Sequence, residues 1–250
     1  MRATLRVKKL SRSRIAEGDS ACLLKSMRSL RSPGLPLRTA ITAALLLGAS
    51  LFAAPEKWAD EINKYTQADA IKAPARDAVV FVGSSSIRKW TSLAADFPGI
   101  TTINRGFGGS ELSDSVFYAD RIVIPYTPRL VVVYAGENDL QAGKSAEALL
   151  ADFQAFCAKI HPALPKTKII FLAVKESPSR AKIRDKVLLA NQLIAAECAQ
   201  DPRRTFVDVA TPMLDAAGKT RPELFIADQL HMQPAGYAIW TQVLAPYLKP

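Results

Sequence analysis

The sequence predicts a three-layer α/β sandwich, doubly wound around a sheet of about five parallel strands. Short Val- and Ile-rich segments alternate along the chain with longer segments whose apolar residues recur at helical spacing. The short segments are continuously apolar, which is typical of strands buried on both faces. With 250 residues, 49% of them hydrophobic and 22% charged, the chain has ample material for one such domain.

An amphipathic helix is expected before the first strand, over residues 56–70. Trp58, Ile62, Tyr65 and Asp69 recur there at helical spacing, and the first three are apolar or aromatic. The Pro-containing stretch at residues 73–76 ends this helix. We therefore expect a helix that packs on the domain that follows.

From residue 76 onward, strands and helices alternate regularly. The expected strands cover residues 78–82, about 101–104, 130–135, 168–174 and 205–209. The expected helices cover about residues 110–122, 146–160, 180–200 and 234–248. Alternating strands and helices predict a parallel sheet with helices on both faces, and ligands of such sheets bind beyond the carboxyl ends of the strands.

The net charge of +10 is concentrated in the leader. Residues 1–38 hold ten Lys and Arg residues against two acidic ones, a net of +8, whereas the remaining 212 residues carry a net of +2. A nearly neutral body excludes a basic nucleic-acid-binding face.

The basic leader runs into an uncharged, mostly apolar stretch at residues 39–54 that ends in small residues. This pattern predicts a secretory signal peptide, cleaved near Ala53 or Ala54, and hence a secreted or periplasmic protein. A retained membrane anchor is the alternative, although the stretch is short for a membrane span. The leader is unusually long, and Met27 begins a more ordinary signal peptide, so residues 1–26 are suspected to come from a misplaced start codon.

The predicted organisation is therefore a leader and signal peptide at residues 1–54, a helix within residues 55–75 and one catalytic domain at residues 76–250. Cys22 lies in the leader, and two interpretations are open for Cys157 and Cys198: two buried free thiols, or a disulfide, which export permits. No Cys/His cluster has the spacing of a zinc site.

Four polar segments follow expected strands or precede the last helix. Gly83-Ser84-Ser85-Ser86, the segment at 104–110 and Gly136-Glu137-Asn138-Asp139 follow the first three strands. Asp228-Gln229-Leu230-His231 precedes the final helix. The first three segments converge at one edge of a parallel sheet, where a serine is placed to act as a nucleophile, a helix cap or part of a phosphate cradle.

These residue types fit acyl transfer. A serine hydroxyl needs a neighbouring base, and of the two histidines His161 lies in a His-Pro pair where a capping or solvated role is expected. His231 follows Asp228 by three residues, a spacing that lets the carboxylate fix the imidazole. Backbone N–H groups of Ser85 and Gly109 and the side-chain amide of Asn138 are candidate donors to an oxyanion.

In order and position, the four segments resemble the sequence blocks of the SGNH hydrolases, also called GDSL esterases/lipases. The resemblance spans about residues 78–248 and implies a flavodoxin-like SGNH hydrolase fold. It implies Ser85 as the nucleophile, Asp228 and His231 as triad acid and base, and Ser85, Gly109 and Asn138 as the oxyanion hole.

The chain departs from the family pattern at Ser84, which stands where the family has the Asp of Gly-Asp-Ser. That Asp is not the nucleophile, so the resemblance still implies the same reaction. It does not predict which hydrogen bonds Ser84 makes near the oxyanion hole.

Structural interpretations stand beside the functional ones. The three serines or Asn138 can cap helices, Gly108-Gly109 can be only a tight turn, and Asp208 competes as triad acid. Two interpretations are open for three charged residues: they line the substrate pocket, or they are solvated surface charges. These residues are Arg105, Glu137 and Arg180. Trp90 and Trp240 are expected in the core.

The sequence thus favours a secreted or periplasmic serine esterase without metal or cofactor, acting on a small-molecule or glycan ester. Short inter-block segments without an evident lid favour short acyl groups, such as O-acetyl esters of glycans. Lysophospholipase, thioesterase or acyltransferase activity uses the same residues. A non-enzymatic flavodoxin-like binding module is the alternative of a different class, whereas an α/β-hydrolase is disfavoured because Ile87 occupies the second Gly position of Gly-x-Ser-x-Gly. Neither nucleic acid nor stable membrane insertion after signal cleavage is expected.

Overall fold

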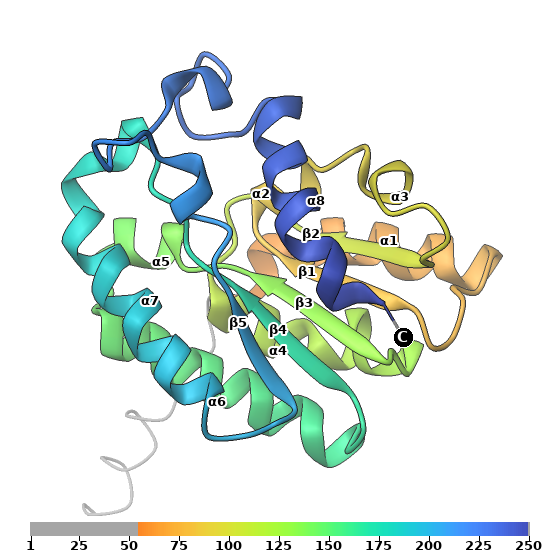
Figure 1. Ribbon diagram of the computed structural model, residues 1–250. Helices are drawn as coiled ribbons and strands as arrows, with labels where there is room; N and C mark the ends of the chain where they lie inside the picture. Colours follow the sequence, from red (N-terminus) through yellow and green to blue (C-terminus); the bar gives the residue numbers. More distant parts are fainter. Residues whose placement is uncertain (1–54, 250) are drawn as a thin grey trace, which may run out of the picture. The chain divides into compact units, whose positions relative to one another are not determined.

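A computed structural model describes residues 55–249 of the chain. In this part of the chain, five strands form one parallel sheet in the order β2-β1-β3-β4-β5 (Figure 1). The strands are β1 (Val79–Gly83), β2 (Thr102–Gly106), β3 (Leu130–Tyr134), β4 (Lys168–Leu172) and β5 (Arg204–Val207). The predicted fold class, an α/β sandwich with about five parallel strands, is confirmed.

Helices cover both faces of the sheet (Figure 1). One face carries α1 (Ala59–Ile71), α4 (Leu112–Ile122), α6 (Ala146–Ala163) and α7 (Arg184–Cys198). The other carries α2 (Ser85–Arg88), α3 (Leu93–Asp96) and α8 (Pro234–Leu248). A short helix, α5 (Glu137–Gln141), follows β3. The remaining turns are 3-10 helices: η1 (Pro55–Trp58), η2 (Ile124–Tyr126), η3 (Pro178–Ile183), η4 (Thr211–Met213) and η5 (Pro222–Leu224).

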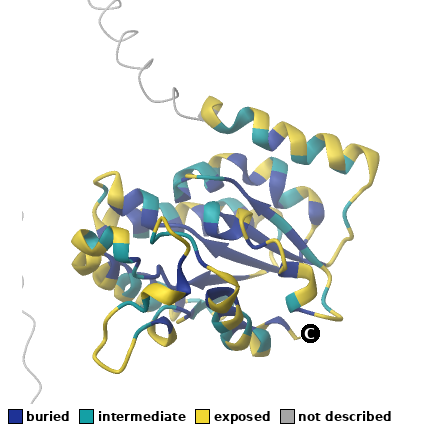
Figure 2. Ribbon diagram, turned by 90° about the horizontal axis from the view of Figure 1, so that it is seen from above, coloured by how far each residue is buried: buried dark blue, intermediate teal, exposed yellow. Residues whose placement is uncertain are grey.

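The continuously buried strands β1 and β3 contribute to two separate cores. Val80 and Val82 of β1 face the core beneath α4, α6 and α7, whereas Val79 and Phe81 face the core beneath α8. Successive strand residues point to opposite faces, so both sets must be apolar when helices cover both sides. In Figure 2 the strands are mostly buried and lie between the helices of the described residues.

The N-terminal helix packs on the domain that follows, as predicted, and it does so at the β2 edge. The Tyr65 hydroxyl donates to the Gly106 carbonyl oxygen, and the Trp58 ring meets Phe107 edge-on with centroids 6.0 Å apart. Asp69 pairs with Arg105, which is only 9% exposed. Arg105 is therefore a buried anchor for this helix, which corrects its reading as a pocket-lining or solvated charge.

Two local features differ from the sequence expectation. The long helix expected over residues 180–200 begins at Arg184, because the chain first makes the 3-10 turn η3, which contains Pro178. The short helices α2, α3 and α5 were not predicted, since four or five residues are too few to show a helical period.

The predicted leader and signal peptide lie outside the described residues. Among the helices of residues 55–249, none combines the length and apolar character that a bilayer span requires.

The strand order fixes the position of the site. The chain starts in the middle of the sheet, passes outward to β2 and then returns to β3 on the other side of β1. The connections leaving β1 and β3 therefore diverge at their carboxyl ends, which is where ligands of such sheets bind. The segments that begin at Ser84 and at Ala135 leave the sheet at this point.

Candidate active site

Ser85 is the first residue of α2, directly beyond the carboxyl end of β1. Gly83 makes the turn possible: it has a φ of +134°, and a Cβ there would lie 1.9 Å from the Tyr134 carbonyl oxygen. The Ser84 N–H donates to that oxygen over 3.0 Å, which ties the turn to β3. Asn104 holds α2 from the other side by donating to the Ile87 carbonyl oxygen over 2.7 Å.

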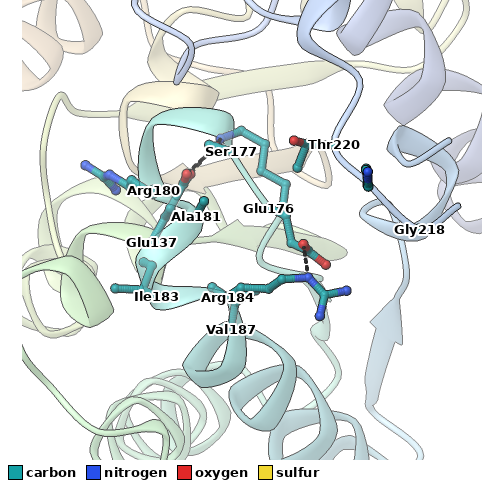
Figure 3. A pocket seen from close by; sticks show the side chains of 12 residues that line it. Glu137, Glu176, Ser177, Arg180, Ala181, Ile183, Arg184, Val187, Gly218 and Thr220 are labelled. Atoms are coloured by element: carbon teal, nitrogen blue, oxygen red, sulfur yellow. Dashed lines mark hydrogen bonds and ion pairs between the residues drawn. The ribbon is translucent and has the colours of Figure 1, made fainter.

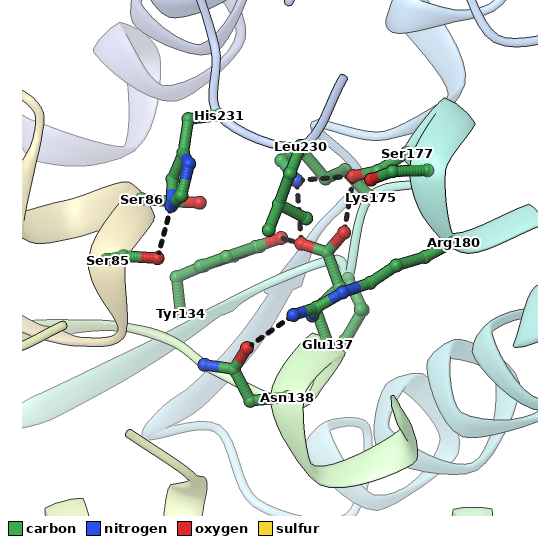
Figure 4. Close-up of polar contacts among 12 residues, drawn as sticks. Ser85, Ser86, Tyr134, Glu137, Asn138, Lys175, Ser177, Arg180, Leu230 and His231 are labelled. Carbon is green, nitrogen blue, oxygen red and sulfur yellow. Dashed lines mark hydrogen bonds and ion pairs between the residues drawn. The ribbon is translucent and has the colours of Figure 1, made fainter. Parts of the chain in front are cut away.

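The three consecutive serines have different surroundings. Ser84 and Ser86 are buried, at 4% and 3% exposure, whereas Ser85 is only partly buried. Ser84 occupies the N-cap position of α2 but makes no side-chain capping bond. The Ser86 carbonyl oxygen accepts from the Tyr237 hydroxyl over 2.9 Å and joins α2 to α8. Among the three, Ser85 has the hydroxyl that faces His231 (Figure 4).

A chain of hydrogen bonds links Ser85, His231 and Asp228. The Ser85 Oγ lies 2.9 Å from His231 Nε2, and His231 Nδ1 lies 2.6 Å from Asp228 Oδ2. With Nδ1–H donating to the carboxylate, Nε2 is free to accept the serine proton. The structure thus brings together the three residues predicted as nucleophile, base and acid, from segments 146 positions apart in the chain.

The loop that carries His231 is wrapped around the Asp228 carboxylate. Asp228 Oδ1 accepts from the N–H groups of Leu230 and His231, each over 2.9 Å. Gln229 has a φ of +53°, which lets the loop turn this tightly. Desolvation by burial raises the pKa of Asp228, but the bonds from the His231 ring and the two N–H groups outweigh it and lower the pKa to about 2. Asp228 therefore stays ionised at neutral pH.

The predicted oxyanion donors surround the same edge of the sheet. The N–H groups of Ser85 and Gly109 have no acceptor among residues 55–249, and Gly109 turns with a φ of +74°. Asn138 lies inside α5, whose N-cap is Gly136, so Asn138 does not cap this helix. Its Nδ2 donates to the Ser110 carbonyl oxygen over 2.8 Å, and its Oδ1 accepts from Arg180 Nη2 over 2.9 Å. One Nδ2 hydrogen and two backbone N–H groups thus have no acceptor among the described residues.

A buried polar network lies beside Asn138, and sequence reasoning missed most of it. The Glu137 carboxylate accepts from Lys175 Nζ over 2.6 Å, from the Tyr134 hydroxyl over 3.1 Å and from the Ser177 hydroxyl (Figure 4). Burial lowers the pKa of Lys175, which is 0% exposed, against the opposing effect of Glu137. Glu137 is therefore a buried, paired carboxylate and not a solvated charge. The sequence feature that could have indicated this network is the polar stretch at residues 175–180, which follows β4 at the same edge of the sheet.

The competing candidates lie elsewhere. Asp208 Oδ1 accepts from the N–H groups of Ala210 and Thr211, so it closes a turn and does not contact His231. His161 lies in the last turn of α6 and is partly exposed, as expected for a histidine at a helix end, although its Nε2 atom is buried without a partner among the described residues.

The predicted core residues are buried, and the two cysteines within residues 55–249 are unpaired. Trp90 and Trp240 are 1% and 0% exposed, as predicted. Cys157 and Cys198 are buried free thiols, and burial raises the pKa of each to about 12. From Pro55 to Lys249, no three His, Cys, Asp or Glu side chains gather in a way that could hold a metal ion.

A cavity of about 330 Å³ lies behind the Glu137 network (Figure 3). Its wall combines Lys175 and Glu137 with residues of η3, of α7 and of the loop at 218–220. Arg184 on this wall pairs with Glu176 over 2.7 Å. Neither Ser85 nor His231 lines this cavity.

The site has the parts required for acyl transfer to a serine. The hydroxyl of Ser85 has a base within hydrogen-bonding distance, the base has an orienting carboxylate, and unoccupied N–H donors lie at the same edge. A phosphate cradle requires several N–H groups at a helix N-terminus but no base, so it leaves the contact between His231 and Asp228 unexplained.

Comparison with known proteins places this site in a family. The model of the GDSL-like Lipase/Acylhydrolase family matches residues 46–239. No curated protein matches the chain.

Solved structures share the fold. A protein from Streptococcus pneumonia matches with a TM-score of 0.68 and 22% identity over 84% of this chain and 99% of its own. A GDSL-like lipase from Bacteroides thetaiotaomicron matches with a TM-score of 0.63 and 24% identity over 75% of this chain and 96% of its own. An acetylxylan esterase from Geobacillus stearothermophilus matches with a TM-score of 0.55 and 15% identity over 71% of this chain and 96% of its own.

The family match covers most of the chain and includes all four polar segments around Ser85 and His231, so the chain belongs to the GDSL-like lipase/acylhydrolase family of ester-hydrolysing enzymes.

Proposed function

We propose that this protein is an exported serine esterase that hydrolyses short-chain carboxylic esters, such as O-acetyl groups on glycans. The observation that carries the proposal is the continuous contact from Ser85 Oγ through His231 to Asp228, beyond the carboxyl end of β1. Family membership supports ester hydrolysis in general.

The proposed reaction passes through an acyl-enzyme. Ser85 Oγ attacks the ester carbonyl carbon while its proton moves to His231 Nε2, and the resulting oxyanion accepts from Ser85 N–H, Gly109 N–H and Asn138 Nδ2. The C–O bond to the alcohol breaks as His231 returns the proton to the leaving oxygen. Water then attacks the acyl carbon, His231 takes its proton, and the carboxylic acid leaves as Ser85 regains its hydrogen.

Short acyl groups are favoured by the exposure of the nucleophile. Ser85 is only partly buried, at the start of a helix that follows β1 without an intervening loop. An open site offers little apolar surface to a long acyl chain, whereas an acetyl group needs little. The acetylxylan esterase with the same fold acts on an acetylated glycan, which is consistent with this choice.

A chain-length series of nitrophenyl esters tests the proposal. We expect the highest kcat/KM with acetate or propionate and a steady fall beyond butyrate. The Ser85→Ala variant should lose at least about 10³-fold in kcat while keeping the melting temperature of the wild type. Undiminished hydrolysis by Ser85→Ala would refute the nucleophile assignment, and a maximum at long chains would refute the substrate class.

Export is part of the proposal and rests on the basic leader followed by the apolar stretch at residues 39–54. Expression of the full chain in a Gram-negative host, followed by fractionation, should release a mature protein into the periplasm with an N-terminus near residue 54. Recovery of the full-length chain only in the cytosol would contradict export, and recovery in the membrane would indicate a retained anchor.

A further inference from the structure

Arg180 lies outside the predicted site but contacts Asn138, one of the oxyanion-hole candidates. It lies in η3, at a break in the turn where φ is −120° and ψ is 24°. From there its Nη2 donates to Asn138 Oδ1 over 2.9 Å. Figure 4 shows Arg180 reaching Asn138 from the side opposite Ser85.

The partners of Asn138 permit only one orientation of its amide. Oδ1 faces the Arg180 donor, and Nδ2 faces the Ser110 carbonyl oxygen 2.8 Å away. A flipped amide would place Nδ2 against a cationic donor and Oδ1 against a carbonyl oxygen, so both bonds would become repulsive. The second Nδ2 hydrogen has no acceptor among the described residues and is left for the substrate.

The Arg180 charge also strengthens that donor. No carboxylate within residues 55–249 forms an ion pair with Arg180, and its guanidinium donates to the Asn138 amide oxygen. A hydrogen bond from a cation polarises the amide and makes its N–H groups better donors, especially where water is partly excluded. The positive charge therefore reaches the oxyanion through Asn138.

The segment that carries Arg180 is held on two sides. Ser177 donates to Glu137, the residue before Asn138, whose carboxylate also pairs with the fully buried Lys175. Ser179 donates to the Gln229 carbonyl oxygen from both its N–H and its hydroxyl, over 3.1 and 3.0 Å. Residues 177–180 thus connect the oxyanion side of the site with the loop that carries the triad acid and base.

We propose that Arg180 is a positioning residue that fixes and polarises the Asn138 amide as an oxyanion donor. The inference rests on the proposed esterase function. It assigns Arg180 a role in the transition state, where negative charge develops on the carbonyl oxygen, and no direct contact with a neutral substrate.

Kinetics of Arg180→Ala with nitrophenyl acetate, an uncharged substrate, tests this role. We expect kcat to fall about 10- to 100-fold with a change in KM of less than about threefold, because the lost interaction acts mainly in the transition state. Arg180→Lys, which keeps the charge, should recover part of kcat. Arg184→Ala is the matched control: it removes an arginine four positions away that lines the same cavity but pairs with Glu176, and its kcat should stay within about twofold of the wild type.

A double-mutant cycle separates positioning through Asn138 from other effects. If Arg180 acts through the amide, Arg180→Ala should reduce kcat by less than about threefold in an Asn138→Ala background. Equal losses in both backgrounds would overturn the proposal, and so would a loss confined to KM for anionic esters, which would indicate direct substrate binding. If Arg180→Ala lowers the melting temperature, Arg180→Lys replaces it in the same cycle. A kcat that Arg180→Lys recovers only when Asn138 is present supports positioning. A kcat that it recovers equally in the Asn138→Ala background refutes positioning.

The activity of Ser85→Ala tests the proposed esterase function independently of the Arg180 inference. Activity that persists in Ser85→Ala overturns the esterase mechanism and this inference with it. Activity that is lost in Ser85→Ala but unchanged in Arg180→Ala overturns the Arg180 inference alone.

Discussion

Three adjacent serines follow β1, and their surroundings separate them. The backbone of Ser84 is bonded to β3 and that of Ser86 to α8, while the hydroxyl of Ser85 is bonded to His231. The substitution of the family's Asp by Ser84 leaves a small buried side chain without a capping bond. The contact between Ser85 and His231 is formed with Ser84 in that place.

At the residue scale, the Asp228 carboxylate predicts a pH-dependent contribution to stability. Its pKa is depressed to about 2 in the folded chain, against about 3.9 in an unfolded one. The contribution is therefore fully present above about pH 5 and is lost as the pH falls through about 2. The side chain is 42% exposed, so the effect should be small and weakened by salt.

Urea unfolding of the wild type and Asp228→Asn at pH 6, 4 and 2 measures this contribution. We expect the wild type to be more stable at pH 6 and the difference in free energy of unfolding to shrink towards pH 2. Asp208→Asn is the control, since Asp208 also bonds backbone N–H groups of its own turn but does not contact a histidine. A difference that is constant or grows towards pH 2 would contradict the assignment.

At the element scale, a second charged cluster holds the segments behind the site together. Lys144 Nζ contacts Glu111 before α4 over 2.9 Å, Asp139 of α5 over 3.1 Å and Asp152 of α6 over 2.7 Å. Asp139 is 0% exposed and also accepts from the Leu112 N–H over 3.0 Å. Burial of the Asp139 carboxyl raises its pKa, so its charge depends on Lys144 for compensation.

Replacement of Lys144 by Met should therefore destabilise the fold by about 2–3 kcal/mol, because it leaves the Asp139 carboxylate buried without its cation. Lys159→Met is the matched control: Lys159 pairs with Asp120 on the surface, and we expect a loss below about 1 kcal/mol. Free energies of unfolding from urea titrations at pH 7 compare the two. Equal losses would show that the buried carboxylate does not set the stability of this cluster.

Around the site, the sequence predicted the positions of strands but not the partners of individual charged side chains. The ends of β1 and β3 were predictable, because their apolar runs stop at or just before a glycine. The end of β2 was expected near residue 104 and lies at Gly106, because this strand is not an apolar run. The roles of Lys175, Ser177 and Arg180 were not, since their partners Glu137 and Asn138 lie about 40 positions away. A charged residue is usually solvated, and only the tertiary fold shows that these are paired.

At the scale of the whole molecule, the sheet and its two cores explain why the fold class could be predicted from the sequence. The two central strands, β1 and β3, are buried on both faces and carry apolar residues towards both helix layers, so they appear in the sequence as unbroken apolar runs. The order β2-β1-β3-β4-β5 then makes β1 and β3 neighbours whose connections diverge at their carboxyl ends. The sequence alone does not state this order, but the convergence of polar segments at one edge follows from any parallel arrangement.

The central claim is that Ser85, among three adjacent serines, is the nucleophile. A fluorophosphonate probe tests it directly: the attacking serine oxygen forms a bond to phosphorus, fluoride leaves, and peptide mass spectrometry locates the adduct. We predict a single adduct on Ser85, absent in Ser85→Ala and strongly slowed in His231→Ala, because His231 accepts the serine proton. An adduct on Ser84 or Ser86, or undiminished labelling of Ser85→Ala, would contradict the account.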